Sequence, residues 1–235
     1  MKLKHIAVAA ALMTSGSAFA GATGNVAVFS DYLYRGITQT GSDAAVQGGL
    51  DYAHASGAYA GTWISSLTGG AGYETDLYAG FAGKAGDVGY DVGYIFYGYR
   101  DGTKANFSEI YAGLTVGSWA AKVYYSPEFY TSEEAAFYVT TSYGFALSDT
   151  LTLTPQIGYS FGDGIEEAVF GGGAFGGVGV PDSYLDYSLT LAKTLEGGYT
   201  FSFAVAANSE DSASGTFGGL NKERVFVGLK KSFDL

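Results

Sequence analysis

Residues 151–161 read LTLTPQIGYSF, and every second residue of this stretch is apolar or aromatic. These positions are Leu151, Leu153, Pro155, Ile157, Tyr159 and Phe161, whereas Thr, Gln, Gly and Ser fill the positions between them. Alternate side chains of a strand point to opposite faces, so this period of two predicts a strand with one apolar and one polar face. Its length matches the roughly 9 to 11 residues of a tilted strand that crosses a membrane.

Comparable segments recur along the chain. The candidate strands are 25–37, 44–54, 58–66, 73–82, 88–99, 107–116, 119–126, 134–146, 151–161, 183–193, 199–208 and 223–233. An even number of strands is typical of single-chain bacterial outer-membrane barrels. The sequence therefore predicts an all-β, transmembrane, antiparallel up-and-down barrel of twelve strands. Ten or fourteen strands are the alternatives, because the alternation is weakest in 58–66 and 134–146.

The predicted connections alternate between short and long. The short ones read ASG, GKAGD, GS, LSDT and TLEGG, and the long ones include residues 162–182 and 209–222. Outer-membrane barrels have short periplasmic turns and longer extracellular loops. We therefore expect the short turns and both ends of the mature chain on the periplasmic side.

The first twenty residues resemble a secretory signal peptide. Lys2 and Lys4 precede a short apolar run, and Ala18-Phe19-Ala20 is a small-x-small cleavage site. We expect residues 1–20 to be the signal peptide and residues 21–235 to be a single barrel domain. Removing Lys2 and Lys4 leaves 10 basic and 23 acidic residues, a formal charge of −13. Nucleic acid is an unsuitable partner for such a chain, because binding depends on cationic side chains that neutralise phosphates.

The composition fits a membrane protein without spanning helices. Charged residues make up only 15% of the chain, whereas aromatic residues make up 16%, and there is no Cys. No later apolar run approaches the roughly 18 residues that a spanning helix needs. A closed barrel leaves no backbone group unpaired in lipid, so outer-membrane lipid is the expected surrounding and the bacterial outer membrane the expected location.

The alternation also predicts which side chains face inward. In NVAVFSDYLYRG, residues 25–36, we expect Val26, Val28, Tyr32 and Tyr34 to face lipid. Asp31 and Arg35 then face inward, because a charge facing lipid would be costly. Asp31 and Arg35 form either a selective constriction or a structural pair. The same reasoning gives the predicted pore-lining set: Asp31, Arg35, Gln47, Asp51, Glu74, Asp76, Asp91, Glu109, Lys122, Asp186, Arg224 and Lys230. Acids exceed bases in this set, which favours cations.

Aromatic side chains on the lipid side should gather in two belts at the strand ends. Tyr34, Trp63, Trp119, Tyr143, Phe161, Tyr199 and Phe233 are the expected members of these belts.

Several stretches resemble the TorF family of putative porins. They are NVAVFSDYLYRGITQTGSDAAVQGGLDYAHASGAYAGTWISS, ETDLYAGFAG, GYDVGYIFYGY and EIYAGLTVGSWAAKVYYS. The resemblance covers nearly the whole mature chain and implies an outer-membrane, channel-like barrel without catalytic residues. The chain departs from the usual aromatic end of such barrels, because Asp234 and Leu235 follow Phe233.

The predicted function is passive diffusion of small hydrophilic solutes or ions, without a cofactor. A barrel plugged by its own side chains, with a structural or surface-interaction role, is the main alternative, and a soluble exported sandwich or barrel is the third. An enzyme is not expected: His54 is the only His of the mature chain and adjoins a predicted periplasmic turn. The residues suggest no metal site either, because Cys is absent and the acidic loops lack the spacing of a calcium loop.

Overall fold

The structure is a computed structural model, and it describes residues 20–68, 72–100, 105–170, 181–209 and 223–235. Residues 1–19, and with them most of the predicted signal peptide, lie outside the described residues. Within the described part of the chain, no helix has the length and apolar character needed to cross a bilayer.

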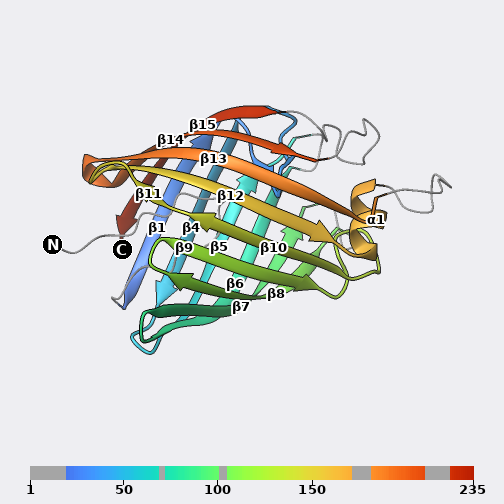
Figure 1. Ribbon diagram of the computed structural model, residues 1–235, viewed down its shortest axis with the longest axis horizontal. Helices are drawn as coiled ribbons and strands as arrows, with labels where there is room; N and C mark the ends of the chain where they lie inside the picture. Colours follow the sequence, from blue (N-terminus) through green and yellow to red (C-terminus); the bar gives the residue numbers. More distant parts are fainter. Residues whose placement is uncertain (1–19, 69–71, 101–104, 171–180, 210–222) are drawn as a thin grey trace.

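The described strands form one closed antiparallel barrel of twelve strands (Figure 1). They are β1 (Gly21–Phe29), β4 (Ala45–Ala53), β5 (Ala58–Ser66), β6 (Tyr73–Ala85), β7 (Val88–Tyr99), β8 (Phe107–Val116), β9 (Trp119–Ser126), β10 (Ala136–Tyr143) with β11 (Phe145–Ala146), β12 (Leu151–Phe161), β13 (Ser183–Leu195), β14 (Tyr199–Asn208) and β15 (Arg224–Asp234). We count β10 and β11 as one strand, because both pair with β12. The β1–β15 pairing closes the barrel, so the sheet has no free edge. The predicted fold class and strand number are confirmed.

The strand bounds follow the predicted segments closely, with one exception. The strands expected at 58–66 and 134–146, where the alternation is weakest, are present as β5 and as β10 with β11. The first strand was predicted over 25–37 but ends at Phe29. Residues 30–44 instead contain a small separate hairpin of β2 (Leu33–Tyr34) and β3 (Ile37–Thr38).

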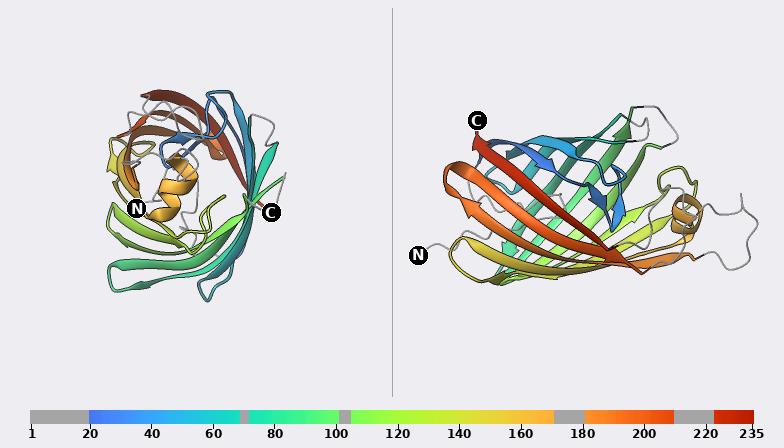
Figure 2. Two further views of the ribbon diagram at one scale, coloured as in Figure 1. Left: turned by 90° about the vertical axis from the view of Figure 1, so that its right-hand side faces the viewer. Right: turned by 90° about the horizontal axis from the view of Figure 1, so that it is seen from above.

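The two ends of the barrel differ. The short connections and the end of β15 lie at one end, and the helix α1 (Asp163–Phe170) lies at the other (Figure 1). Viewed from the α1 end, the strands form a ring, and α1 lies across its opening (Figure 2). Ile165, Ala168 and Val169 of α1 are buried, which indicates that one face of the helix packs against the barrel contents. We call the two ends the short-turn end and the long-loop end.

The outer surface of the wall is apolar. Val26, Val46, Leu77, Ile110 and Val225 are among the exposed large hydrophobic side chains, and each alternates with an inward neighbour. A soluble protein rarely exposes so extensive an apolar surface, whereas lipid covers it in a membrane barrel. The interior, in contrast, contains most of the buried polar and charged side chains.

A charge on the outer face should therefore destabilise the barrel according to its depth. Leu77, near the middle of β6, is 55% exposed, whereas Leu195 is the last residue of β13 at the short-turn end. We expect Leu77→Arg to lower the free energy of unfolding by about 2–4 kcal/mol and Leu195→Arg by at most about 1 kcal/mol. Urea unfolding in lipid vesicles measures both values, and equal losses at the two positions would contradict this placement in the bilayer.

Candidate functional site in the barrel interior

Residues 31–40 form a hairpin inside the barrel, which we call the inner hairpin. Its ends are close together in the wall, because Phe29 of β1 pairs directly with Ala45 of β4. Leu33 pairs with Thr38 and Tyr34 with Ile37, so Arg35 and Gly36 form the two-residue turn. Their φ angles are +49° and +77°. Positive φ at both central residues is the requirement of a type I′ turn, which reverses the chain here.

This turn overturns the predicted placement of Tyr32 and Tyr34 on the lipid side. Tyr32 is only 8% exposed and lies among the buried residues of the interior, and Tyr34 packs against the same cluster. The prediction failed because it extended the alternation of β1 through the Arg35–Gly36 turn. Asp31 and Arg35 do point into the interior, but they belong to the inner hairpin rather than to the wall.

The base of the inner hairpin is organised around the Asp31 carboxylate. The hydroxyls of Thr38 and Thr40 donate to Asp31 Oδ1 at 2.6 and 2.9 Å. Arg224 of β15 pairs with Asp31 Oδ2 at 3.4 Å, and the Tyr32 amide donates to Thr40 Oγ1 at 3.1 Å. These contacts fix the fold of the hairpin and attach its base to the wall.

The tip of the inner hairpin is attached through Arg35. Arg35 Nη2 lies 2.7 Å from both carboxylate oxygens of Glu109 on β8. The guanidinium carbon also lies 4.6 Å from the ring centre of Tyr34, 5.2 Å from that of Tyr124 and 4.3 Å from that of Tyr138. Cations are attracted to aromatic faces at such distances. The expected alternative of an Asp31–Arg35 pair is wrong, since each residue pairs with a different strand of the wall.

Three acidic side chains of the wall surround the hairpin. Glu74 is 1% exposed, Asp76 is 0% exposed and Glu109 is 1% exposed. The Tyr32 hydroxyl donates to Glu74 Oε1 at 2.7 Å, and the Tyr97 hydroxyl donates to Glu109 Oε2 at 3.1 Å. Neither carboxylate oxygen of Asp76 has a hydrogen-bond partner among the described residues. The interior at this level is thus filled, and it has an excess of acidic groups.

Tyr32 remains a hydrogen-bond donor over the whole physiological pH range. Burial, and then the carboxylates of Glu74 and Asp76, raise the pKa of Tyr32 well above its ordinary value. The neutral phenol therefore persists and continues to donate to Glu74.

The short-turn half of the interior contains a second set of paired groups. Lys122 Nζ pairs with Asp91 Oδ2 at 2.8 Å, and the Tyr59 hydroxyl donates to Asp91 Oδ1 at 2.6 Å. The Tyr78 hydroxyl donates to Asp51. Lys230 occupies an inward position of β15, between the outward Leu229 and Lys231, and is exposed.

The remaining predicted residues also lie inside. Gln47 Nε2 donates to Ser65 at 3.2 Å, and the Tyr138 hydroxyl donates to Asp186 Oδ1 at 3.2 Å. The structure thus places all twelve predicted residues on the inward face or on the inner hairpin. Their role in lining a pore stays a prediction.

The aromatic residues of the site were largely missed. Trp63 was expected in a lipid-facing belt, but it is buried and packs against Tyr32 with ring centres 5.3 Å apart. Trp63 shares one face of β5 with Gly61 and Ser65, whereas the large apolar Ile64 lies on the opposite face. This alternation was the available signal that Trp63 points inward. For Tyr34 the signal was Gly36, which follows Arg35 at a position that suits a two-residue turn.

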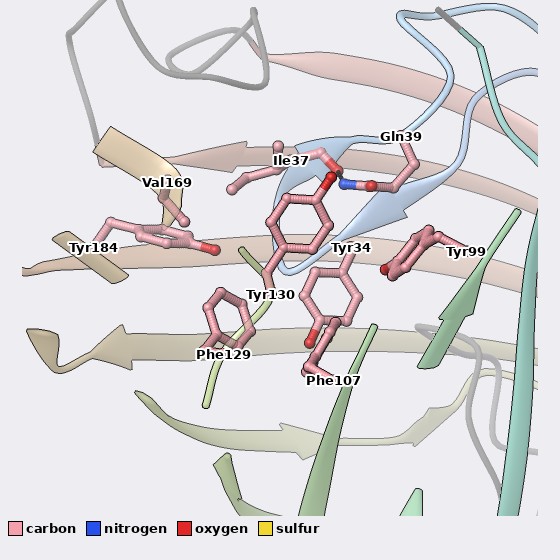
Figure 3. A pocket seen from close by; sticks show the side chains of 9 residues that line it. All are labelled: Tyr34, Ile37, Gln39, Tyr99, Phe107, Phe129, Tyr130, Val169 and Tyr184. Atoms are coloured by element: carbon pink, nitrogen blue, oxygen red, sulfur yellow. Dashed lines mark hydrogen bonds between the residues drawn. The ribbon is translucent and has the colours of Figure 1, made fainter. Parts of the chain in front are cut away.

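An aromatic pocket lies between the inner hairpin, α1 and the loop at 127–135 (Figure 3). Its lining residues are Tyr34, Ile37, Gln39, Tyr99, Phe107, Phe129, Tyr130, Val169 and Tyr184. Phe107 and Phe129 lie edge to face with ring centres 5.0 Å apart. This cluster packs the hairpin against the long-loop end and adds to the closure of the interior there.

A family comparison places this architecture among known sequences. Residues 13–233 match the family described as "Bacterial protein of unknown function (Gcw_chp)". The chain belongs to this family. The resemblance to TorF porins stays a prediction, because the family description does not name them. No curated protein matches the chain.

Solved structures share the fold of this Gcw_chp chain. The KdgM porin matches with a TM-score of 0.59 at 11% identity, over 90% of this chain and 99% of KdgM. The NanC porin matches with a TM-score of 0.58 at 9% identity, over 92% of this chain and 100% of NanC. The COG4313 outer membrane channel from Pseudomonas putida F1 matches with a TM-score of 0.52 at 12% identity, over 92% of this chain and 96% of the channel. At these identities the likeness concerns the fold alone, which is that of bacterial outer-membrane channels.

Proposed function

We propose that the protein is an outer-membrane channel for passive diffusion of small hydrophilic solutes, with a preference for cations. The observation that carries the proposal is the closed twelve-stranded barrel with an apolar exterior and an ionisable interior. Charged side chains are expensive in a membrane protein unless they face water or one another, so they mark solute pathways. The fold shared with KdgM, NanC and the COG4313 channel supports the same function.

The charge distribution supports the cation preference. In the short-turn half, Asp51 and Asp91 are balanced by Lys122 and Lys230. Among the described residues around the inner hairpin, five are acidic and buried, namely Asp31, Glu74, Asp76, Glu109 and Asp186. Arg35 pairs with Glu109 and Arg224 with Asp31. Acidic groups around a constriction favour cations. The KdgM porin has been solved with oligogalacturonate, an acidic sugar chain, and this interior is poorly suited to such an anion.

Single-channel recording in a planar bilayer with a salt gradient tests the proposal. We expect discrete openings from a mostly closed state and a reversal potential biased toward cations. A second function, a permanently closed barrel with a structural or surface role, is favoured by the near-complete burial of Glu74, Asp76 and Glu109. A barrel that inserts, shows heat-modifiable folding and never conducts would contradict the channel and favour that second function.

Neutralising Asp31 should reduce the cation preference. Its carboxylate pairs with Arg224 at 3.4 Å and accepts hydrogen bonds from the hydroxyls of Thr38 and Thr40. We expect Asp31→Asn to shift the reversal potential toward zero, because a negative charge beside Arg224 is removed from the interior. Asp149→Asn, in an exposed short turn, is the matched control and should leave the potential unchanged. Equal potentials in the native barrel and the folded Asp31 variant would contradict this assignment.

A further inference from the structure

The wall of the barrel contains a half-cage that holds a guanidinium group. Its members are Glu109 on β8, Tyr124 on β9 and Tyr138 on β10, three consecutive neighbours in the sheet. Tyr124 and Tyr138 pair directly across β9 and β10, so their rings project side by side from the wall. A carboxylate beside two aromatic faces provides two acceptor oxygens and two attractive ring surfaces. This combination matches the planar, donor-rich guanidinium better than it matches a compact ammonium.

The occupant of this half-cage is not part of the wall. Arg35 lies at the turn of the inner hairpin, and its φ of +49° is an unfavourable conformation for a residue with a side chain. Beside it, Asn208 Nδ2 donates to the Gly36 carbonyl at 3.1 Å. The hairpin thus places a cation in a site that the wall builds without it.

Several hydrogen-bonding atoms of Arg35 and of the acidic side chains near it are buried without partners among the described residues. Arg35 Nη1 has no partner among the described residues, although it is buried. Asp186 Oδ2 and both oxygens of Asp76 also lack partners among those residues. Buried polar atoms are usually paired, so an unused donor on Arg35 and unused acceptor oxygens on the wall indicate that Arg35 fills this region without satisfying it fully.

We propose that Glu109, Tyr124 and Tyr138 form a binding site for guanidinium-bearing solutes and that Arg35 is its internal occupant. This inference rests on the proposed channel function and names its substrate class. A solute enters the site when Arg35 leaves it, and the same carboxylate and rings then contact the solute. Arg35 thus competes with the solute.

Isothermal titration of the full-length mature barrel in detergent tests the site directly. Methylguanidinium chloride is titrated into the native barrel and into Arg35→Ala, with methylammonium chloride at equal ionic strength as the comparison ligand. We expect Arg35→Ala to bind methylguanidinium at least about tenfold more tightly than methylammonium, and about tenfold more tightly than the native barrel does. Adding Glu109→Gln to Arg35→Ala should remove this preference.

Two further variants keep the test decisive. Arg35→Gln retains a hydrogen-bonding side chain at the turn and is titrated in parallel, and heat-modifiable mobility verifies that each barrel is folded. Lys193→Ala removes an exposed cation near the short-turn end and should behave as the native barrel. Equal affinities for the two ligands in the folded Arg35 variants, or equal methylguanidinium affinities in native and variant barrels, would overturn the site.

The titration tests the binding site and the bilayer recording tests the channel, so each proposal can be contradicted without the other. A barrel that conducts but whose Arg35 variants do not prefer methylguanidinium would contradict this inference and leave the channel standing. A barrel that never conducts but whose Arg35 variants bind methylguanidinium would contradict the channel and support the site.

Discussion

A barrel in which residues 31–43 are replaced by a short Gly-Ser turn is expected to conduct ions continuously. Phe29 and Ala45 are direct partners on neighbouring antiparallel strands, so a short turn can join β1 to β4 without disturbing the wall. The deletion removes Tyr32, Tyr34 and Arg35 from the interior. If the native contacts favour the closed state by only about 1.4 kcal/mol, the deletion raises the mean conductance about tenfold, and stronger contacts give a larger increase.

Planar-bilayer recording of both proteins measures this increase. The control carries the same Gly-Ser linker in the exposed turn at 54–57, at the opposite end of the barrel, and should conduct as the native protein does. Heat-modifiable mobility verifies that both altered barrels are folded. A folded deletion variant with native conductance would mean that the inner hairpin does not close the lumen.

Glu109→Ala should produce the largest loss of stability among single substitutions of the site. It leaves the Arg35 guanidinium, whose side chain is 6% exposed, without its carboxylate partner. Breaking a buried ion pair by removing one partner typically costs about 3–5 kcal/mol, because an uncompensated charge remains. Urea unfolding in vesicles measures the loss. Trp63 fluorescence is a suitable probe, because the indole contacts Tyr32 of the inner hairpin.

A double-mutant cycle separates the pair from its surroundings. We expect Arg35→Ala with Glu109→Ala to be less destabilised than the sum of the single variants, because no lone charge is left buried. Additive losses would show that Arg35 and Glu109 do not interact. That result would contradict the Arg35–Glu109 pair as the main attachment of the hairpin tip.

The wall of the barrel was predictable because its physical rule is local. In β12 and β13 every second side chain faces lipid, so the alternation of Leu151, Ile157, Leu185 and Leu189 with small or polar residues directly predicts both faces. The positions of the short turns were also predictable from the sequence, since neighbouring antiparallel strands need only a few residues to connect them.

The inner hairpin was not predictable from alternation. Tyr32 and Tyr34 continue the period of β1, and a Tyr is equally suited to a lipid boundary and to a hydrogen-bonded interior. Its destination depends on partners distant in sequence: Tyr32 contacts Glu74, and Arg35 contacts Glu109. Only Gly36, placed after Arg35 in a sequence that suits a two-residue turn, marked the reversal locally.

Locking the inner hairpin with a reversible disulfide tests the central claim most directly. The chain has no Cys, and a Cβ at Gly36 would lie 3.3 Å from Asn208 Cβ, close to the separation in a disulfide. It would also lie 2.8 Å from Asp186 Cβ, so the hairpin turn must shift away from Asp186 to accept the cysteine. Gly36→Cys with Asn208→Cys, recorded in a planar bilayer with Asn208→Cys alone as the control, should stay closed when oxidised and open when a reductant is added. Equal conductance before and after reduction would contradict an inner hairpin that must move for solutes to pass.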